Sequence, residues 1–214
     1  MTYFLSLRLL MICWTFGLLN VGYCNGSAVH EHGYWVGKEV MKEHQFDPWL
    51  AHALAQFFKK ENAQSVVDMG CGPGDYVRVL RAYQIPCEGY DGNPDTVELS
   101  QGLCQVVDLS EPFHLDQSFD WVLSLEVAEH LPKVYETIFI ENLHRHSTRG
   151  IVLSWAIKGQ GGFGHFNEQN NDYVKNLMSK YGYINDLLAE NELRKFAALW
   201  WFKNTIMVFR KVTP

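Results

Sequence analysis

The chain has 214 residues, of which 47% are hydrophobic, 14% aromatic and 20% charged, and its formal net charge at pH 7 is −6. This composition excludes a disordered chain and a coiled coil, and it is typical of a globular domain with one substantial core. The acidic balance disfavours a dedicated nucleic-acid binder, because such proteins usually carry a basic excess.

The first residues have the pattern of a targeting segment. Arg8 precedes an apolar run from Leu9 to Leu19, and small or polar residues dominate from Asn20 to Ala28. A positive start, a short apolar centre and small residues at the end are typical of a secretory signal peptide. Residues 1–24 are therefore predicted to be a signal peptide that directs the protein to the secretory pathway, either to the ER lumen or out of the cell. The alternative is an uncleaved membrane anchor over residues 9–29, since the uncharged stretch continues that far.

Residues 25–46 are expected to form a cap segment, followed by the main domain at residues 47–214. Asp47 and Pro48 predict the start of a helix, as N-cap and first-turn residues. Apolar strands then alternate with helices, which indicates an α/β fold with a parallel sheet covered on both faces. The predicted strands are 65–69, 88–91, 105–108, 119–125, 150–156, 181–186 and 204–211; the later helices are 76–83, 95–101, 133–146, 171–180 and 188–199.

The most informative segment is the glycine-rich turn after the first of these strands, in the run from Val66 to Tyr76 (VVDMGCGPGDY). Glycines let the backbone pass close to a ligand, and the following helix begins with free N–H groups. Doubly wound folds hold nucleotide-like cofactors in this way. Asp75 stands where the dinucleotide fingerprint G-x-G-x-x-G has its last glycine, which disfavours a nicotinamide-dependent oxidoreductase.

The spacing G-x-G-x-G from Gly70 to Gly74, with Asp68 before it, resembles motif I of the class I S-adenosylmethionine-dependent methyltransferases. Later segments resemble that family in the same order: Tyr90-Asp91, Val107-Asp108-Leu109, and the run from Phe119 to Pro132 (FDWVLSLEVAEHLP). The resemblance, of the methyltransferase type 11/23 kind, covers about residues 34–211. It implies a Rossmann-like fold of seven strands in the order 3-2-1-4-5-7-6, with the last strand antiparallel.

The resemblance also implies a reaction and a cofactor. The expected function is transfer of a methyl group from S-adenosylmethionine to a small-molecule acceptor, as O- or N-methylation, by in-line displacement. The alternative is a non-catalytic binding module on the same fold. No nucleic-acid partner is expected, and the membrane is a partner only through the N-terminal segment. The residues expected to bind the cofactor are Tyr34, Asp68, Gly70, Cys71, Gly72, Gly74, Asp91, Gly92, Asn93, Asp108, Leu109 and Glu126.

Glu126, Glu129 and His130 form an ExxEH segment that resembles the metal-binding segment of some O-methyltransferases, including ubiquinone-pathway enzymes. In those relatives a later histidine completes the site, and His165 is the candidate here. The resemblance thus implies a divalent metal, Mg²⁺, Mn²⁺ or Fe²⁺, on Glu126, Glu129, His130 and His165. The same segment occurs without a metal in other family members, so both alternatives stand. Glu126, His130 and His165 are the expected catalytic residues.

Several residues are candidates for contact with the acceptor. A glycine-rich loop, Gly159 to Gly164, is either a lid or a solvent loop, and His165 and Asn167 beyond it are expected to touch the substrate. Aromatic residues at Trp155, Phe163, Phe166, Trp200 and Trp201 either line the pocket or pack the core. Family members often close the site with an N-terminal helix, on which Tyr34 and Trp35 are expected, whereas His30 and His32 are expected to be exposed.

Cysteines suggest two alternatives. Cys71 is expected to have a packing role in the glycine turn. Cys87 and Cys104 open adjacent predicted strands, so they form either a disulfide or two buried thiols.

Overall fold

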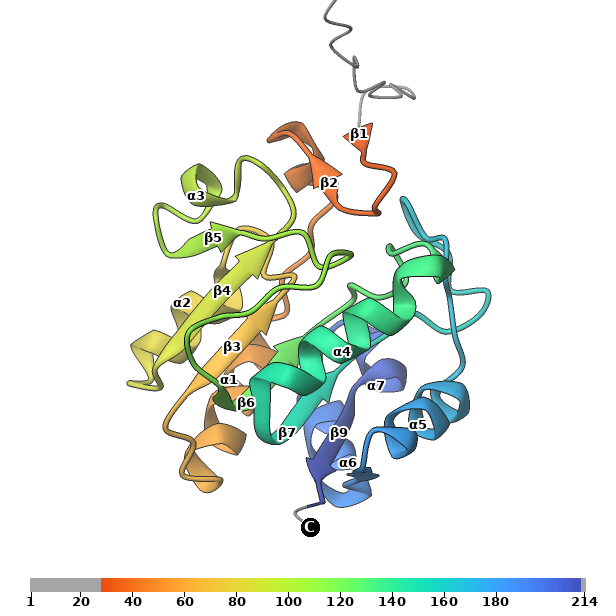
Figure 1. Ribbon diagram of the computed structural model, residues 1–214. Helices are drawn as coiled ribbons and strands as arrows, with labels where there is room; N and C mark the ends of the chain where they lie inside the picture. The colour runs from red at the N-terminus through yellow and green to blue at the C-terminus, as the bar shows by residue number, and fades with distance from the viewer. Residues whose placement is uncertain (1–27, 213–214) are drawn as a thin grey trace, which may run out of the picture.

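The computed structural model describes residues 28–212, so the predicted leader, residues 1–24, lies outside the described part. A seven-stranded sheet forms the centre, with helices on both faces (Figure 1). The central strands are almost wholly buried because helices cover both of their faces. The strands are Val66–Met69 (β3), Cys87–Asp91 (β4), Cys104–Val106 (β5), Phe119–Ser124 (β6), Ser147–Leu153 (β7), Tyr183–Asn185 (β8) and Met207–Lys211 (β9).

The strands lie in the order β5-β4-β3-β6-β7-β9-β8. β9 is antiparallel to both of its neighbours, and the other pairs are parallel. Counted from β3, this is the predicted order 3-2-1-4-5-7-6. The order reverses between β3 and β6, and in open sheets of this kind the carboxyl ends at the reversal leave a crevice for a ligand.

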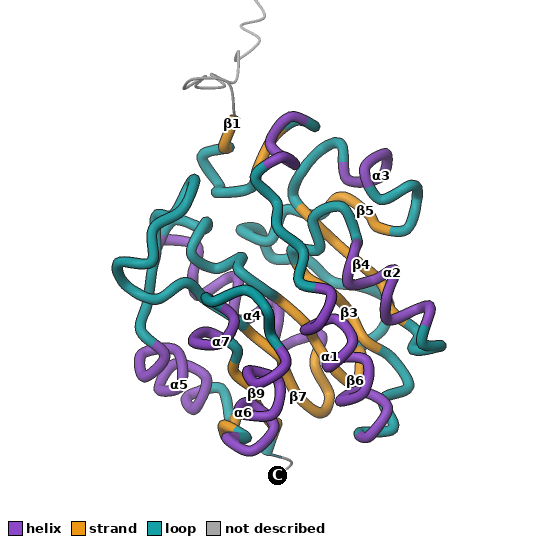
Figure 2. Tube along the Cα trace, turned by 180° about the vertical axis from the view of Figure 1, so that it is seen from behind, coloured by secondary structure: helices purple, strands orange, loops and turns teal. Residues whose placement is uncertain are grey.

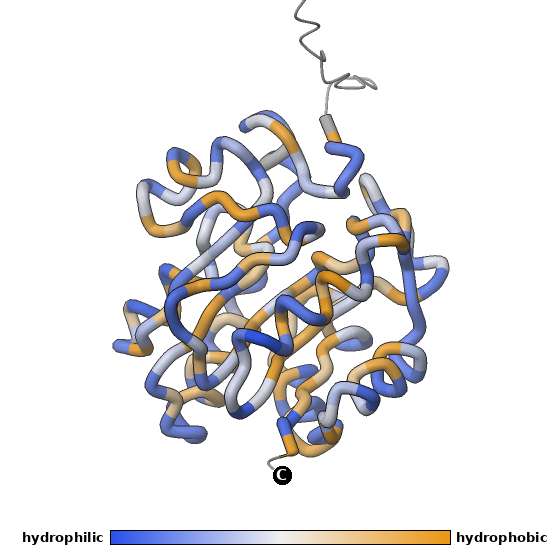
Figure 3. The backbone as a smooth tube through the Cα atoms, in the orientation of Figure 1, coloured by the Kyte–Doolittle hydropathy of each residue, from blue (hydrophilic) through white to orange (hydrophobic). Residues whose placement is uncertain are grey.

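The helices form one layer on each face of the sheet. Pro48–Lys60 (α1), Asp75–Ala82 (α2) and Leu187–Phe196 (α6) pack with the fully buried Trp121 on one face. Glu136–His146 (α4) and Asn171–Lys180 (α5) pack with Trp155 on the other. Figure 1 shows α4 in front of the sheet, and Figure 2 shows α1 and α6 in front from the opposite side. Hydrophobic residues follow the central strands between these layers (Figure 3). Short helical turns complete the fold: Thr96–Leu99 (α3), Lys133–Tyr135 (η2) and Phe202–Thr205 (α7).

Asp47 begins α1, as predicted, and also ties this helix to the C-terminal part of the chain. Its Oδ1 accepts hydrogen bonds from the N–H groups of Trp49 and Leu50, at 3.1 and 3.0 Å. Its Oδ2 accepts from the N–H groups of Ala198 and Leu199, at 2.7 and 2.8 Å. The Asp47 side chain is fully buried. One carboxylate therefore satisfies four backbone donors at the ends of two segments.

The N-terminal segment differs from the expected helix. Ala28–Val29 (β1) and Trp35–Val36 (β2) form an antiparallel hairpin, followed by the 3-10 turn Glu39–Lys42 (η1). The chain turns at Gly33, whose φ is +95° and whose N–H donates to the His30 carbonyl at 2.8 Å. A residue with this φ breaks a helix, so Tyr34 and Trp35 reach the main domain from a turn and a strand.

Two boundaries near the C-terminus were predicted wrongly. α6 ends at Phe196 rather than at Leu199, since the Asp47 carboxylate binds the N–H groups of the next turn. The last strand begins at Met207, because Asn204 and Thr205 belong to α7. Within residues 28–212, no helix has both the length and the apolar character needed to cross a bilayer.

Cys87 and Cys104 open β4 and β5 as predicted, but they do not form a disulfide. The register pairs Cys104 with Gly89, two residues beyond Cys87. A side chain at Gly89 would place its Cβ 2.5 Å from the Cys104 Sγ and 3.0 Å from the Cys71 Sγ. The buried thiols of Cys71 and Cys104 thus fill the space beside Gly89. This is the packing role expected of Cys71.

Candidate active site

A cavity of about 360 Å³ opens where the strand order reverses. Its walls come from the segments after β3, β4, β5 and β6, from the N-terminal hairpin, and from the loops after β7 and α6. Most of the predicted cofactor residues line it: Tyr34, Asp68, Gly70, Cys71, Gly72, Asp91, Gly92, Asp108, Leu109 and Glu126. The structure therefore brings together residues that are up to about ninety positions apart in the chain.

Gly74 and Asn93, the other two predicted cofactor residues, do not line the cavity. Gly74 precedes α2 with a φ of +80°, and its Cα faces the Cys104 thiol. Asn93 is buried, with its side-chain amide donating to the Gly37 carbonyl and its side-chain oxygen accepting from the Asp95 N–H. Both residues shape the backbone beside the cavity rather than its surface.

The turn after β3 requires glycine for two reasons. Gly70 and Gly72 have φ values of +86° and +52°, which L-residues with side chains adopt at a cost. A Cβ at Gly70 would lie 2.2 Å from the Val127 Cγ2, and one at Gly72 would lie 3.0 Å from the His44 Nε2. The N–H groups of Gly70 and Cys71 both donate to the Tyr90 carbonyl, at 2.7 and 3.1 Å. The turn is therefore fixed to β4 and closely packed against the cavity wall.

Three acidic residues that line the cavity, Asp68, Asp91 and Asp108, differ in hydrogen bonding and in pKa. Asp68 is buried, its Oδ2 has no hydrogen-bond partner among residues 28–212, and burial raises its pKa well above the usual value. Burial also raises the pKa of Asp91. The N–H groups of Gly72 and Asn93, which donate to its two oxygens at 2.8 Å each, lower this pKa but do not outweigh burial. Burial would raise the pKa of Asp108, but hydrogen bonds involving His32 and Ser110 outweigh it and lower this pKa. Asp68 thus has an acceptor free for a ligand.

The N-terminal hairpin covers this acidic side of the cavity, which corrects the expectation that its histidines are exposed. His32 lines the cavity, with Nδ1 2.6 Å from the Asp108 Oδ2. His30 stacks on Tyr34 with ring centroids 4.3 Å apart. Tyr34 in turn lies over Gly92, where an added Cβ would be 2.5 Å from the Tyr34 Cβ. The hairpin is thus held by contacts to two segments that follow β4 and β5.

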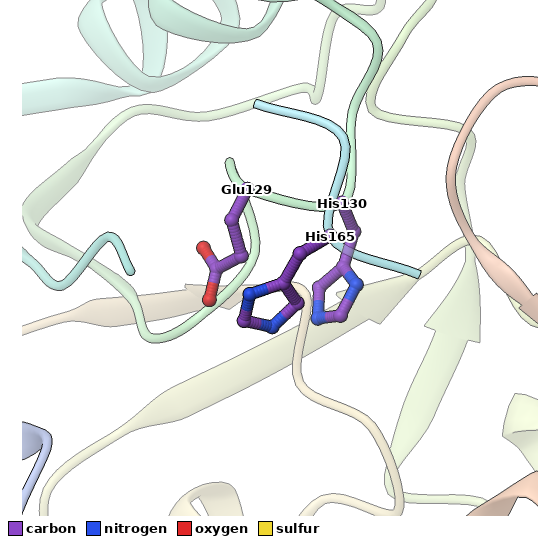
Figure 4. A group of neighbouring side chains, drawn as sticks. All are labelled: Glu129, His130 and His165. Atoms are coloured by element: carbon purple, nitrogen blue, oxygen red, sulfur yellow. The ribbon is translucent and has the colours of Figure 1, made fainter. Parts of the chain in front are cut away.

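Glu129, His130 and His165 converge on the other side of the cavity (Figure 4). One ligand atom of each lies within 4.8 Å of the others. Glu129 is fully buried, and within residues 28–212 neither of its oxygens makes a hydrogen bond of normal geometry. Burial, together with the adjacent Glu126 carboxyl, raises its pKa well above the usual value. Burial and the neighbouring His165 lower the pKa of His130 to about 4, so its imidazole is neutral at pH 7. A buried carboxyl beside two imidazole rings is a donor set suited to a divalent cation.

Each of these two imidazoles has an oxygen beside its Nδ1. The Nδ1 of His130 is 3.1 Å from the Gly164 carbonyl, and that of His165 is 3.1 Å from the Glu168 Oε1. Outer partners of this kind orient the histidines of metal sites and fix which nitrogen is free. The Nε2 of His130 is thus left for a ligand, whereas the Nε2 of His165 lies against Gly162, where an added Cβ would be 2.3 Å away.

Glu126 was predicted in the metal set but lies outside the group of three. Gln160 Nε2 donates to its Oε2 at 2.8 Å, and Thr205 Oγ1 donates to its Oε1 at 3.1 Å. Its N–H donates to Ser154 Oγ at 2.8 Å, in a backbone conformation with a φ of +52°. Burial raises the Glu126 pKa despite these hydrogen bonds. Left-handed backbone at a non-glycine residue is concentrated at functional sites.

The expected acceptor-contact residues divide into two groups. Phe163, His165, Trp200 and Trp201 line the cavity, as do Gly161 and Gly162 of the glycine-rich loop. Asn167 does not, since its amide donates to Glu136 Oε2 at 3.0 Å and the residue is buried. Trp155 is fully buried in the core, and Phe166 is exposed to solvent.

Three residues of the site were not predicted from the sequence: His44 and Gln160, which line the cavity, and Thr205, which does not. His44 lies over Gly72, and burial lowers its pKa. Gln160 and Thr205 hold Glu126 from two different segments. No motif marks any of the three, because their positions depend on how the cap segment, the loop after β7 and α7 fold onto the sheet.

Comparison with known proteins places this site in a family. The family model for a methyltransferase domain matches residues 41–154, more than half of the chain. A probable chloroplastic tocopherol O-methyltransferase of Oryza sativa subsp. japonica is 30% identical over 155 residues, which cover 61% of this chain and 42% of that protein. The ajmaline N-methyltransferase of Rauvolfia serpentina is 31% identical over 106 residues, 44% of this chain and 36% of that protein.

A solved structure supports the same assignment at the level of fold. The magnesium protoporphyrin IX methyltransferase of Synechocystis PCC 6803, crystallised with bound SAH, superposes with a TM-score of 0.58 at 16% identity, over 76% of this chain and 81% of that one. The chain spans about two fifths of the length of the curated relatives named above. The family match, the strand order and the glycine turn agree, and the chain belongs to the methyltransferase domain family.

Proposed function

We propose that the protein is an S-adenosylmethionine-dependent methyltransferase that acts on a small-molecule acceptor. The observation that carries the proposal is the cavity at the switch point, with the closely packed glycine turn and the unpartnered Asp68 oxygen in its wall. A buried acceptor without a partner is costly unless a ligand supplies a donor. The related plant proteins are named as O- and N-methyltransferases, which favours a small acceptor for this chain too.

The residues of the cavity fit the cofactor. The side of the cavity formed by Gly70, Gly72 and the three acids would hold a nucleoside and an amino-acid moiety, because it offers open backbone and carboxylate acceptors. When bound, S-adenosylmethionine supplies an electrophilic methyl group on a sulfonium. The chain itself aligns the acceptor with that group and excludes water, since Tyr34 and His32 cover the cavity from the hairpin.

The acceptor would occupy the opposite side of the cavity. Phe163, Trp200 and Trp201 give this side aromatic walls, and Gln160 and His165 supply polar groups. An apolar pocket with few polar groups is typical of sites for small organic molecules. Glu126, with a pKa raised by burial, is suited to accept a proton from an acceptor hydroxyl or ammonium group.

Glu129, His130 and His165 would hold a divalent metal ion. The bare Glu129 oxygens and the neutral His130 fit this role, since metal ligands must be free of protons and of other partners. A divalent ion held by these residues would supply Lewis acidity to the acceptor side of the cavity, which would favour hydroxyl acceptors. The alternative is a metal-free site that binds an amine.

The leader and location form a separate part of the proposal. The sequence favours entry into the secretory pathway, with anchoring by residues 9–29 as the alternative. Protease protection of the full chain in microsomes, with and without detergent, distinguishes a luminal domain from one that faces the cytosol.

A methyl-transfer assay with radiolabelled S-adenosylmethionine and a panel of small phenols and amines tests the function. We expect transfer that requires Asp91 and is stimulated by Mg²⁺, Mn²⁺ or Fe²⁺ for phenols. Metal binding is measured on the full chain by calorimetry with Mn²⁺. Glu129→Gln should abolish binding, whereas the matched variant Glu126→Gln should retain it, because Glu126 lies outside the group. Mn²⁺ binding unchanged by Glu129→Gln would contradict the metal site.

A further inference from the structure

We propose that an aromatic surface beside the mouth of the cavity lies on a lipid bilayer. We call this surface the aromatic rim; it consists of Trp49, Phe163, Phe196 and Trp200, which are 64%, 39%, 62% and 54% exposed. Phe163 and Trp200 line the main cavity, and Trp49 and Phe196 line a groove of about 330 Å³ between α1 and α6. Clusters of large exposed apolar side chains mark interaction surfaces in soluble proteins.

The groove and the cavity mouth are held together by direct contacts. The Asp47 carboxylate binds the first turn of α1, which carries Trp49, and also the N–H groups of Ala198 and Leu199. Trp200 follows at once, with its ring centroid 5.8 Å from that of Trp201 in the cavity wall. Because one buried carboxylate fixes both segments, the part of the rim formed by Trp49 and Trp200 is preformed.

The N-terminal end of the described chain points to a bilayer as the occupant. The hairpin β1–β2 is preceded by residues that include the apolar run from Leu9 to Leu19. Val29, at the start of this hairpin, packs at Gly164, where an added Cβ would be 3.2 Å from the Val29 Cγ2. Gly164 is the neighbour of Phe163 in the rim. If residues 9–29 are retained as the membrane anchor, the alternative to a cleaved signal peptide, they would bring the rim to the lipid.

Exposed lysines accompany the rim in the chain. Lys195 precedes Phe196, Lys203 follows the Trp200-Trp201 pair closely, and Lys158 opens the loop that carries Phe163. All three are exposed and form no ion pair with other residues in the range 28–212. Tryptophan and phenylalanine flanked by lysine are typical of surfaces that lie in the headgroup region, where the rings enter the lipid and the ammonium groups meet anionic headgroups.

Docking in this way has a consequence for the acceptor. The cavity mouth would open onto the headgroup layer, so acceptors dissolved in the membrane would reach the aromatic side of the cavity directly. This consequence, a lipid-soluble acceptor, rests on the proposed methyltransferase function. The docking itself does not, because it depends on the rim, the lysines and the apolar segment that precedes the hairpin.

Hydrogen exchange of the full chain, with and without vesicles of phosphatidylcholine containing phosphatidylserine, tests the docking. We expect exchange to slow at least about fivefold in peptides that cover 47–52, 160–166 and 196–203, with no change in peptides at the start of α6. The rim variant carries Trp49→Ser, Phe196→Ser and Trp200→Ser. The matched control carries Leu187→Ser and Leu188→Ser, which are 55% and 80% exposed at the other end of α6.

The rim variant should lose the protection and the control should keep it, while exchange in β3 and β6 reports that both are folded. If hydrogen exchange in the rim peptides is unchanged by vesicles, the proposal is overturned. This holds also if the full chain sediments with the vesicles, because the leader alone could then bind the lipid. Protection that appears without lipid and increases with protein concentration would overturn it in favour of a second copy of the chain. Cofactor binding is measured on the same samples, so loss of the proposed function is distinguished from loss of docking.

Discussion

Substitution of Gly70 by alanine tests whether the glycine turn and the loop after β6 form one rigid wall. Gly70 has a φ of +86°, and a Cβ there would lie 2.2 Å from the Val127 Cγ2 and 2.9 Å from its Cγ1. Gly102 offers a matched control, since its φ is +80° and nothing lies within 4 Å of an added Cβ. Both variants adopt the same unfavourable backbone conformation, but only Gly70→Ala meets the valine.

The structure gives different magnitudes for the two variants. Left-handed backbone should lower the free energy of unfolding by about 1–2 kcal/mol in each. Gly70→Ala should lose about 1–3 kcal/mol more through overpacking against Val127. Adding Val127→Ala removes both clashing methyl groups, so the double variant should recover most of that extra loss as a coupling energy of about 1–3 kcal/mol.

Urea denaturation with linear extrapolation measures the stabilities, and calorimetric titration with S-adenosylhomocysteine measures the site. We expect Gly70→Ala to weaken binding at least about tenfold, since Gly70 and Val127 both line the cavity and must move apart to relieve the 2.2 Å contact. If Gly70→Ala is no less stable than Gly102→Ala and binds equally well, the wall is compliant and the reasoning is refuted.

Further predictions concern three other residues. His130→Gln should flatten the pH dependence of stability: burial holds the His130 pKa at about 4, below the unfolded value of about 6.5, so the wild-type protein loses about 2 kcal/mol on acidification to pH 5 through this group. Thermal unfolding from pH 7 to pH 5 measures this, and identical slopes for variant and wild type would contradict it. Asp47→Ala should lower the free energy of unfolding by about 3–5 kcal/mol in urea titrations, because four backbone N–H groups lose their acceptor; a loss below about 1 kcal/mol would contradict that role. Asp91→Asn keeps one acceptor for the two N–H groups of Gly72 and Asn93, so affinity for S-adenosylhomocysteine should fall at least about tenfold in calorimetry; unchanged affinity would exclude Asp91 from the cofactor site.

Local patterns were sufficient for most of the fold. The apolar runs around Val66 and Phe119 predicted central strands, and α5 was predicted with its observed limits, Asn171–Lys180. These elements have strong periodicity and clear ends. The glycine turn and the acids after β4 and β5 were also recognisable, because chemistry fixes them at strand ends.

Errors arose where distant contacts decide the structure. The end of α6 depends on Asp47, which lies about 150 positions earlier. The Cys87–Cys104 alternatives depended on a register that adjacency of strands does not reveal. His32 was expected to be exposed because no local signal announces Asp108 as its partner. Glu126 shares a motif with Glu129 and its carboxyl adjoins that of Glu129, yet its two oxygens bond Gln160 and Thr205, and it lies outside the group of three ligand candidates.

Calorimetric titration of the full chain with S-adenosylmethionine and with S-adenosylhomocysteine tests the central proposal most directly. We predict micromolar binding of both by the wild-type protein. Gly72→Arg should abolish binding, because a Cβ at Gly72 already lies 3.0 Å from the His44 Nε2 and the longer side chain must enter the cavity. A folded wild-type protein that binds neither compound would contradict the account and leave a non-catalytic binding module on the methyltransferase fold.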